Sequence, residues 1–149
     1  MKSLFTTEAY SEIKNRLNSM SETSQRQWGK MTAGQMAHHC QKAFLVPLEK
    51  TTPKKPPLFM RLMIPFFKKS LYNDKPWKKG MPTPKEFQVR DDRDFEKERE
   101  RLLSLIDEFH QKGEAHNWPK HPAFGEFTTQ QWGQMEYKHL DHHLRQFGV

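Results

Sequence analysis

Four segments of the sequence repeat apolar residues at intervals of three and four, and this periodicity constrains the fold more than any other feature. The segments run from about Thr7 to Met20, Thr32 to Val46, Asp92 to Lys112 and Thr128 to Phe147. The spacing predicts a helix with one apolar side for each segment. Such helices can bury their apolar sides only against one another. The sequence therefore predicts an all-α fold, a four-helix bundle.

The ends of these segments carry residues that start and stop helices. Thr32 with Gln35, and Thr128 with Gln131, have the spacing of a capping box, which satisfies free N–H groups at a helix start. Gly113 follows the third segment and predicts its end. The residues expected on the buried sides of the first three helices are Ala9 or Tyr10, Ile13, Leu17, Met20, Ala33, Met36, Ala37, Cys40, Ala43, Phe44, Phe95, Leu102, Ile106 and Phe109.

Residues 47–91, between the second and third segments, are basic and rich in proline. Eight of the ten prolines fall here, and Lys50 to Lys85 contain ten Lys and Arg residues but a single acid, Asp74. Proline fixes φ and removes a backbone donor. We therefore expect a long, mostly irregular insertion with one short helix near Leu58 to Ser70. No strand is expected in the chain.

This insertion has three interpretations. Its apolar residues, Leu58, Met60, Leu62, Met63 and Ile64, predict a lid over the bundle. Its lysines alternatively attract an anionic ligand. Because lysines also lie near Phe66, Phe67, Tyr72 and Trp77, contact with nucleic acid or with a membrane surface is a third interpretation. The chain has no recognisable nucleic-acid motif, so we rank the lid first, the anion second, and nucleic acid or membrane last.

Length and cysteine content predict the domain count and the compartment. The 149 residues suit a single domain, residues 1–149. With Cys40 as the one cysteine, no intramolecular disulfide can form, and Met1 to Tyr10 lack the apolar stretch of a secretory signal. The longest apolar-rich run, Leu58 to Phe67, is too short to span a membrane. We therefore expect a soluble, cytoplasmic protein.

Two histidines lie on the side of the fourth segment that should be buried. His139 and His143 are four residues apart, so both imidazoles face the same way. At about 100° per residue, the same stripe also holds Trp132, Met135, Glu136, Gln146 and Phe147, while Lys138, Asp141 and Arg145 face away. An unpaired imidazole in a core costs about 1 to 3 kcal/mol. Some partner should therefore satisfy both rings.

A third histidine extends this pattern to the second segment. His39 lies at the edge of the apolar arc and His38 points away, although an error of one residue in helix phase would exchange them. A bundle that sets the second helix beside the fourth would bring His39, His139 and His143 together. Three neutral imidazoles suit Zn²⁺ or Ni²⁺ and leave coordination positions open. The simpler alternative is a set of buried histidines bonded to backbone or carboxylate groups.

The neighbouring polar residues have simpler interpretations. Glu136 and His139 form a Glu-x-x-His pair, but a di-metal site needs a second pair, which the second segment lacks. We expect a partly exposed Glu136, with a hydrogen bond to an imidazole as the alternative, and a small buried Cys40. His110, His116, His121 and His142 are expected at the surface or in loops, with His121 either fixing a loop or lining a site.

Three stretches carry a resemblance to a known family: WGKMTAGQMAHHC from Trp28 to Cys40, HPAFG from His121 to Gly125, and HLDHHLRQFG from His139 to Gly148. They resemble the DinB-like (YfiT-like) metalloenzyme superfamily, and more closely an uncharacterised branch of it, over nearly the whole chain except residues 47–91. The resemblance implies a four-helix bundle, often dimeric, with one metal on His39, His139 and His143. In characterised members the metal assists transfer or isomerisation of low-molecular-weight thiols, but the fold alone does not fix the substrate.

These observations together predict a metal-dependent enzyme. A three-histidine site with Zn²⁺ or Ni²⁺ activates water or a thiol, so both hydrolysis and thiol transfer are open. The expected substrate is a small molecule, a thiol or an anion, and the resemblance adds a homodimer. No residue can be given the role of general acid or base. The competing hypothesis is a non-catalytic bundle protein that binds a metal or an anionic ligand.

Overall fold

The structure, a computed structural model, describes residues 1–52, 64 and 66–149, and within them it is helical. The long helices are α1 (Thr7–Asn18), α2 (Ala33–Leu45), α4 (Phe95–Lys112) and α5 (Thr129–Gln146), and two short 3₁₀ turns are η1 (Lys69–Leu71) and η2 (Lys85–Phe87). These described ranges contain no strand, and their one β-bridge joins His121 to Gly125. The predicted all-α class is therefore confirmed for this part of the chain.

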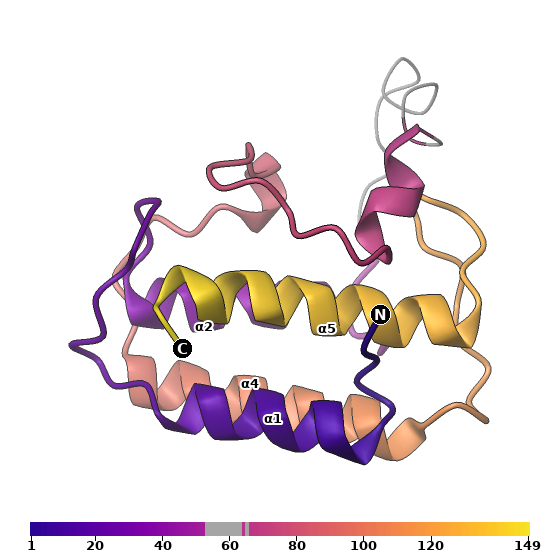
Figure 1. Ribbon diagram of the computed structural model, residues 1–149, viewed down its shortest axis with the longest axis horizontal. Helices are drawn as coiled ribbons and strands as arrows, with labels where there is room; N and C mark the ends of the chain where they lie inside the picture. The colour runs from indigo at the N-terminus through magenta and orange to yellow at the C-terminus, as the bar shows by residue number, and fades with distance from the viewer. Residues whose placement is uncertain (53–63, 65) are drawn as a thin grey trace.

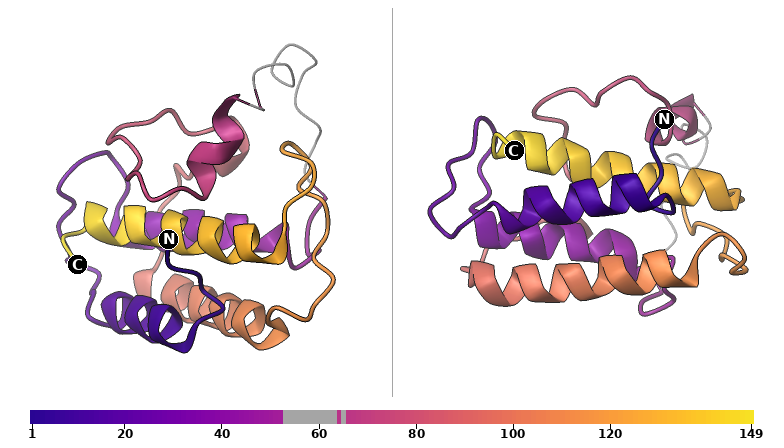
Figure 2. Two further views of the ribbon diagram at one scale, coloured as in Figure 1. Left: turned by 45° about the vertical axis from the view of Figure 1, so that its right-hand side comes forward. Right: turned by 60° about the horizontal axis from the view of Figure 1, so that its bottom comes forward.

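The four long helices lie side by side around a shared core. Helix α2 lies against α4 and α5, and α1 also lies against α4 and α5. Figures 1 and 2 show the resulting two layers, with α1 and α4 in one layer and α2 and α5 in the other. This arrangement sets α2 beside α5, which the proximity of the three histidines requires.

Side-chain caps define where the helices begin. Both predicted capping boxes are present, at Thr32 with Gln35 on α2 and at Thr128 with Gln131 on α5. Helix α4 begins later than the expected Asp92, because the side chain of Asp94 accepts the Lys97 N–H at 3.0 Å and caps the helix there. The predicted stop of α4 is confirmed, since the backbone of Gly113 has a φ of 64°.

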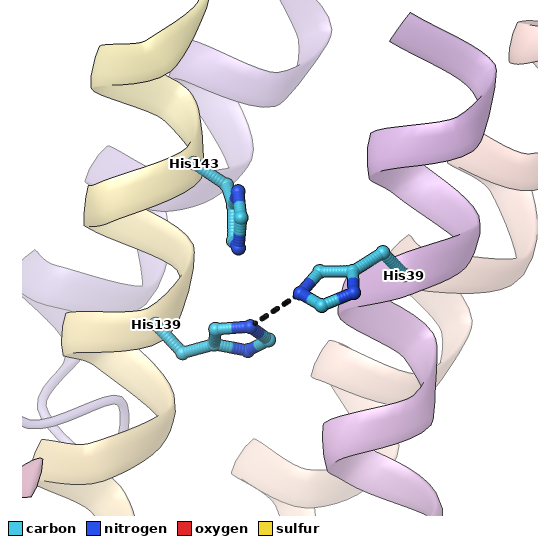
Figure 3. Close-up of side chains that lie close together, drawn as sticks. All are labelled: His39, His139 and His143. Atoms are coloured by element: carbon cyan, nitrogen blue, oxygen red, sulfur yellow. Dashed lines mark hydrogen bonds between the residues drawn. The ribbon is translucent and has the colours of Figure 1, made fainter. Parts of the chain in front are cut away.

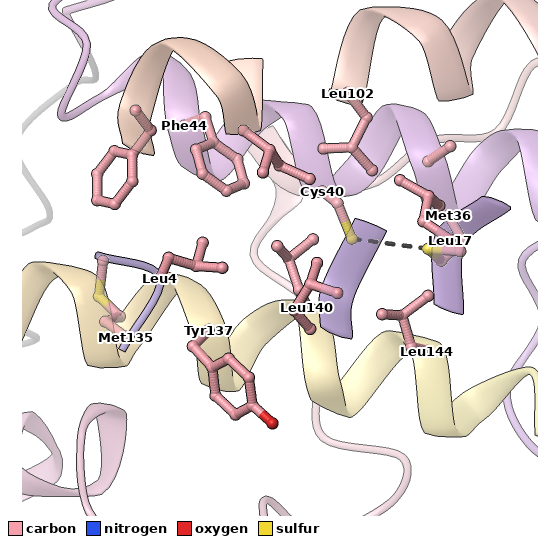
Figure 4. Packing of buried hydrophobic residues seen from close by; sticks show 14 of the residues in the cluster. Leu4, Leu17, Met36, Cys40, Phe44, Leu102, Met135, Tyr137, Leu140 and Leu144 are labelled. Atoms are coloured by element: carbon pink, nitrogen blue, oxygen red, sulfur yellow. Dashed lines mark hydrogen bonds between the residues drawn. The ribbon is translucent and has the colours of Figure 1, made fainter. Parts of the chain in front are cut away.

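The core is formed by the predicted apolar sides of the helices. On α4 the side chains of Phe95, Leu102, Ile106 and Phe109 are fully buried, and burying such a side chain stabilises the fold by about 1.5 to 3 kcal/mol. Figure 4 shows helices α2 and α5 contributing to the same cluster, in which the Cys40 thiol lies 3.7 Å from the Met36 sulfur. Cys40 is buried, as predicted, and burial raises the pKa of its thiol.

Part of the stretch 47–91 covers the outer side of α5 and corrects one prediction. Lys138 does not face solvent but is buried, and its ammonium donates to the carbonyl oxygens of Ser70 and Asn73 at 2.7 and 2.8 Å. The side-chain oxygen of Asn73 accepts a third hydrogen bond at 2.7 Å. The prediction failed because a neighbouring segment covers this side of the helix and supplies oxygen partners, which helical periodicity cannot reveal.

The short helix expected near Leu58 to Ser70 can be assessed only in part. Residues 58–63 and 65 lie outside the described residues, whereas residues 66–68 are helical and lead into η1. Tyr72 packs on the ring of Phe127, but Phe66 and Phe67 are exposed. None of the helices in the described ranges is long and apolar enough to cross a membrane.

Candidate metal centre

The structure brings the three predicted imidazoles together. His39 of α2 faces His139 and His143 of α5, and one ring nitrogen from each lies within 4.8 Å of the other two (Figure 3). The Nε2 atoms of His39 and His139 are 3.1 Å apart. All three side chains are buried, with exposed fractions of 5 to 8%. The predicted proximity is therefore confirmed, and the cluster could hold a metal ion.

The adjacent histidine, His38, points elsewhere. Its Nδ1 lies 3.0 Å from a carboxylate oxygen of Glu98 on α4, so its ring turns toward α4 and away from the cluster. Consecutive residues of a helix differ by about 100° in direction. The ambiguity between His38 and His39 is thus resolved in favour of His39.

Two oxygen acceptors determine which nitrogens of the cluster carry protons. The Nδ1 of His39 lies 2.9 Å from the carbonyl oxygen of Phe87, and a carbonyl can only accept. The Nδ1 of His143 lies 2.9 Å from Oε1 of Gln146, whose amide nitrogen donates to the Trp28 carbonyl at 2.8 Å. Both Nδ1 atoms therefore donate, and each Nε2 keeps its lone pair for a ligand.

The spacing of the nitrogen atoms fits the geometry of metal ligands. Two nitrogens at about 2.0 to 2.1 Å from one ion lie roughly 3 Å apart when the ligand angle is about 90 to 110°. The 3.1 Å between Nε2 of His39 and Nε2 of His139 matches this value. The Nδ1 of His139 is buried and has no hydrogen-bond partner among the described residues.

Burial also sets the protonation state of the cluster. Desolvation lowers the pKa of His39, lowers that of His139 well below its ordinary value, and lowers that of His143 to about 3. The three imidazoles are therefore uncharged at neutral pH. Neutral imidazole is the form that ligates Zn²⁺ and similar ions.

Side chains from residues 47–91 close over this cluster. The ring of Phe87 lies 6.0 Å from that of His39, and the ring of Trp77 lies 5.9 Å from that of His139. Phe87 could not be identified from the sequence, because the group that contacts His39 is a backbone carbonyl, which any residue carries. Gln146 was placed on the correct side of α5, but its role depends on Trp28, which is distant in sequence.

Glu136 corrects a second prediction. Its side chain is fully buried instead of partly exposed, and neither carboxyl oxygen has a hydrogen-bond partner among the described residues. Burial raises the pKa of this carboxyl to about 8. The alternative, a hydrogen bond from Glu136 to an imidazole, is not observed either. Its position in the stripe of α5 that carries His139 and His143 is the sequence signal for this burial.

The remaining histidines make more contacts than surface residues would. His121 fixes its loop, since its Nδ1 accepts the N–H groups of Ala123 and Phe124 at 3.1 and 3.2 Å. His110 is partly buried, with Nδ1 donating to the Leu4 carbonyl at 2.7 Å. His142 is also partly buried. The loop-fixing interpretation of His121 is therefore confirmed, whereas the surface interpretation of His110 and His142 is wrong, because the periodicity of a helix does not reveal which neighbouring segments cover it.

The fold and the cluster thus define a helical protein with three converging, buried histidines. A family model described as "Protein of unknown function (DUF1569)" matches residues 2–148. The chain belongs to this family. Comparisons with curated proteins and with solved structures found no match.

Proposed function

We propose that this protein is a metal-dependent enzyme in which His39, His139 and His143 hold one divalent ion, Zn²⁺ or Ni²⁺. The observation that carries the proposal is the 3.1 Å separation of Nε2 of His39 from Nε2 of His139, together with the hydrogen bonds that leave the Nε2 lone pairs of His39 and His143 free for a ligand. A buried nitrogen lone pair without a partner lowers the free energy of unfolding. A shared cation would use these lone pairs.

The chemistry proposed for the site is thiol transfer or hydrolysis on a small thiol or anion. When bound, a divalent ion supplies Lewis-acid chemistry by acidifying a water or thiol in an open coordination position. The Phe87 carbonyl and the Gln146 amide would hold His39 and His143 in the required tautomer and orientation. Trp77 and Phe87 would limit the access of bulk water to the cluster.

The broader setting of this proposal follows from the sequence resemblance. We propose that the family is a branch of the DinB-like superfamily, with one domain over residues 1–149 and the helices arranged as its four-helix bundle. Residues 47–91 would be an insertion between α2 and α4 that acts as a lid. We also propose that the protein is a homodimer and is located in the cytoplasm. Support for the arrangement comes from the pairwise packing of the four long helices.

Elemental analysis of protein purified without a metal-affinity tag tests metal binding. The wild-type chain should contain about one Zn²⁺ or Ni²⁺ per chain, and His39→Ala and His143→Ala should lose it. His116→Ala is the matched control, because this partly buried histidine packs on Trp118 outside the cluster. Wild-type protein without metal, even after incubation with Zn²⁺ and Ni²⁺, would contradict the proposal and indicate purely structural histidines.

Activity assays separate the enzyme from a non-catalytic metal-binding protein. Panels of thiol-transfer and hydrolase substrates should reveal an activity that His139→Ala abolishes while its circular dichroism spectrum stays helical. The His116→Ala control should keep that activity. A metal-loaded wild-type protein that is inactive across both panels would support the binding protein instead.

A further inference from the structure

A cavity of about 320 Å³ lies on the outer side of α5, next to the three-histidine cluster. Its walls include Trp28, Trp77 and His142, together with Lys79, Asp141 and Arg145. A volume of this size is at the lower end of the range for small-molecule sites. The cavity therefore suits a compact ligand with few atoms.

Aromatic rings form much of the wall. The ring of His142 lies 5.9 Å from the indole of Trp28 and 5.6 Å from the indole of Trp77, at interplanar angles of 61° and 59°. The two indoles thus contact the same imidazole from different segments of the chain. Flat, unsaturated ligands pack well against such surfaces, because aromatic pairs add about 0.5 to 1.5 kcal/mol to the burial of their area.

The charge of the lining favours an anion. Three basic side chains, Lys79, Lys138 and Arg145, face a single acid, Asp141. The ammonium of Lys138 already donates to three oxygens, and Arg145 pairs with Asp141 at 3.3 Å. Lys79 makes no ion pair within the described residues, and its Nζ lies 4.5 Å from the centre of the Trp28 ring. Lys79 is therefore the cation placed to receive a negative group beside an aromatic surface.

Two side chains that line the cavity also contact histidines of the candidate metal centre. His142 lines the cavity and its ring lies 5.1 Å from that of His143. Trp77 also lines the cavity and its ring lies 5.9 Å from that of His139. A ligand in the cavity would consequently lie one side chain away from the three histidines.

We propose that this cavity, lined by Trp28, Trp77, His142 and Lys79, binds a small, flat organic anion such as an aromatic carboxylate. The carboxylate pairs with Lys79 and the ring packs against the indoles. Binding of the anion does not require a metal. Only the assignment of this anion as the substrate class of the neighbouring centre rests on the proposed function.

Titration with benzoate tests the proposal, followed by tryptophan fluorescence and by calorimetry. Benzoate should bind saturably, whereas benzyl alcohol, which lacks the charge, and cyclohexanecarboxylate, which lacks the flat ring, should each bind at least about fivefold more weakly. Absence of saturable benzoate binding, or equal binding of benzyl alcohol, would overturn the proposal.

Matched variants locate the binding. Lys79→Gln should weaken benzoate binding by about five- to tenfold, since it removes a charge-assisted contact. Lys78→Gln removes the same charge from an exposed neighbour outside the cavity lining and should leave the affinity within about twofold of wild type. Trp28→Leu should weaken binding as Lys79→Gln does. Equal losses in the two lysine variants would indicate diffuse electrostatic attraction and refute the cavity.

A metal-site variant separates this proposal from the proposed function. His39→Ala alters the cluster but no residue of the cavity lining. It should bind benzoate as wild type does, whether or not the wild-type protein contains a metal. If the wild-type protein binds benzoate but contains no metal, the cavity proposal stands and only the metal centre is refuted. If it contains a metal but does not bind benzoate, the metal centre stands and the cavity proposal is refuted.

Discussion

Helices α4 and α5 each bury a glutamate, and the two side chains have opposite environments. Glu98 of α4 accepts a hydrogen bond from Gln41 at 2.7 Å and lies 3.0 Å from Nδ1 of His38, whereas Glu136 of α5 has no partner among the described residues. Burial alone would raise both pKa values. For Glu98, His38, Gln41 and Arg101 reverse this effect and lower the pKa, while that of Glu136 rises to about 8.

The same contrast extends along the two helices, which both contain 18 residues. The buried side of α4 is apolar apart from Glu98, while that of α5 also carries His139, His143 and Gln146. Buried polar groups reduce stability unless they are paired. We infer that α4 chiefly stabilises the fold and that α5 gives up stability to hold the candidate site.

The largest effect is expected from Phe109→Ala on α4. The Phe109 ring lies 4.9 Å from Phe5 and 4.5 Å from Trp118, and its side chain is fully buried. Truncation should lower the free energy of unfolding by about 3 to 5 kcal/mol through lost contacts and a cavity. Urea unfolding measures this change. A loss below about 1 kcal/mol would contradict the stabilising role assigned to α4.

Glu136→Gln should stabilise the protein in a pH-dependent manner. Because burial raises the pKa of Glu136 from 4.5 to about 8, the folded state keeps a proton that the unfolded state releases. The stability contributed by the protonated carboxyl of Glu136 is fully present below about pH 4.5 and is lost as the pH rises toward 8. The variant should therefore gain about 3 kcal/mol at pH 7 and nothing near pH 4. Urea unfolding at both pH values checks this, and an equal change at both would refute it.

The same substitution at Glu98 should act in the opposite direction. Glu98→Gln removes the charge from a carboxylate bonded to Gln41 and His38, so the free energy of unfolding should fall by about 1.5 to 3 kcal/mol at pH 7. The loss should shrink in acid, because the lowered pKa of Glu98 makes its stabilisation disappear as the pH falls through that value. A gain in stability at pH 7 would remove the distinction between the two glutamates.

The smallest expected effect concerns the site itself. Gln146→Leu removes the acceptor for Nδ1 of His143, and metal affinity measured by chelator competition should fall about 10- to 100-fold. Gln111→Leu on α4 changes an exposed glutamine and serves as the control. Equal affinities in both variants would show that Gln146 does not orient His143.

Much of the helical structure was predictable because it depends on local sequence. The capping boxes at Thr32 and Thr128 act within one helical turn, and the apolar periodicity around Leu102 and Ile106 reports the buried side directly. The same reasoning placed His139 and His143 on one side of α5. Local patterns failed at Lys138, whose burial depends on Ser70 and other residues far away in sequence.

The partners of the histidines could not be predicted for a related reason. The acceptor for His39 is a backbone carbonyl at Phe87, and the amide of Gln146 is oriented by the carbonyl of Trp28. Carbonyl groups occur at every position, so a sequence does not indicate which one will approach an imidazole. The cavity at Trp28 and Trp77 depends on the same long-range packing.

By itself, the sequence determined most of the helical segments, their caps, their apolar sides and the shared direction of His139 and His143, because these follow from the fixed pitch of a helix. Only the tertiary structure decided that the nitrogens of His39 and His139 lie 3.1 Å apart and that Glu136 has no hydrogen-bond partner in the described part of the chain. These features depend on how α2, α5 and the covering segment pack together. Distances between elements depend on contacts remote in sequence, and a one-dimensional pattern does not contain them.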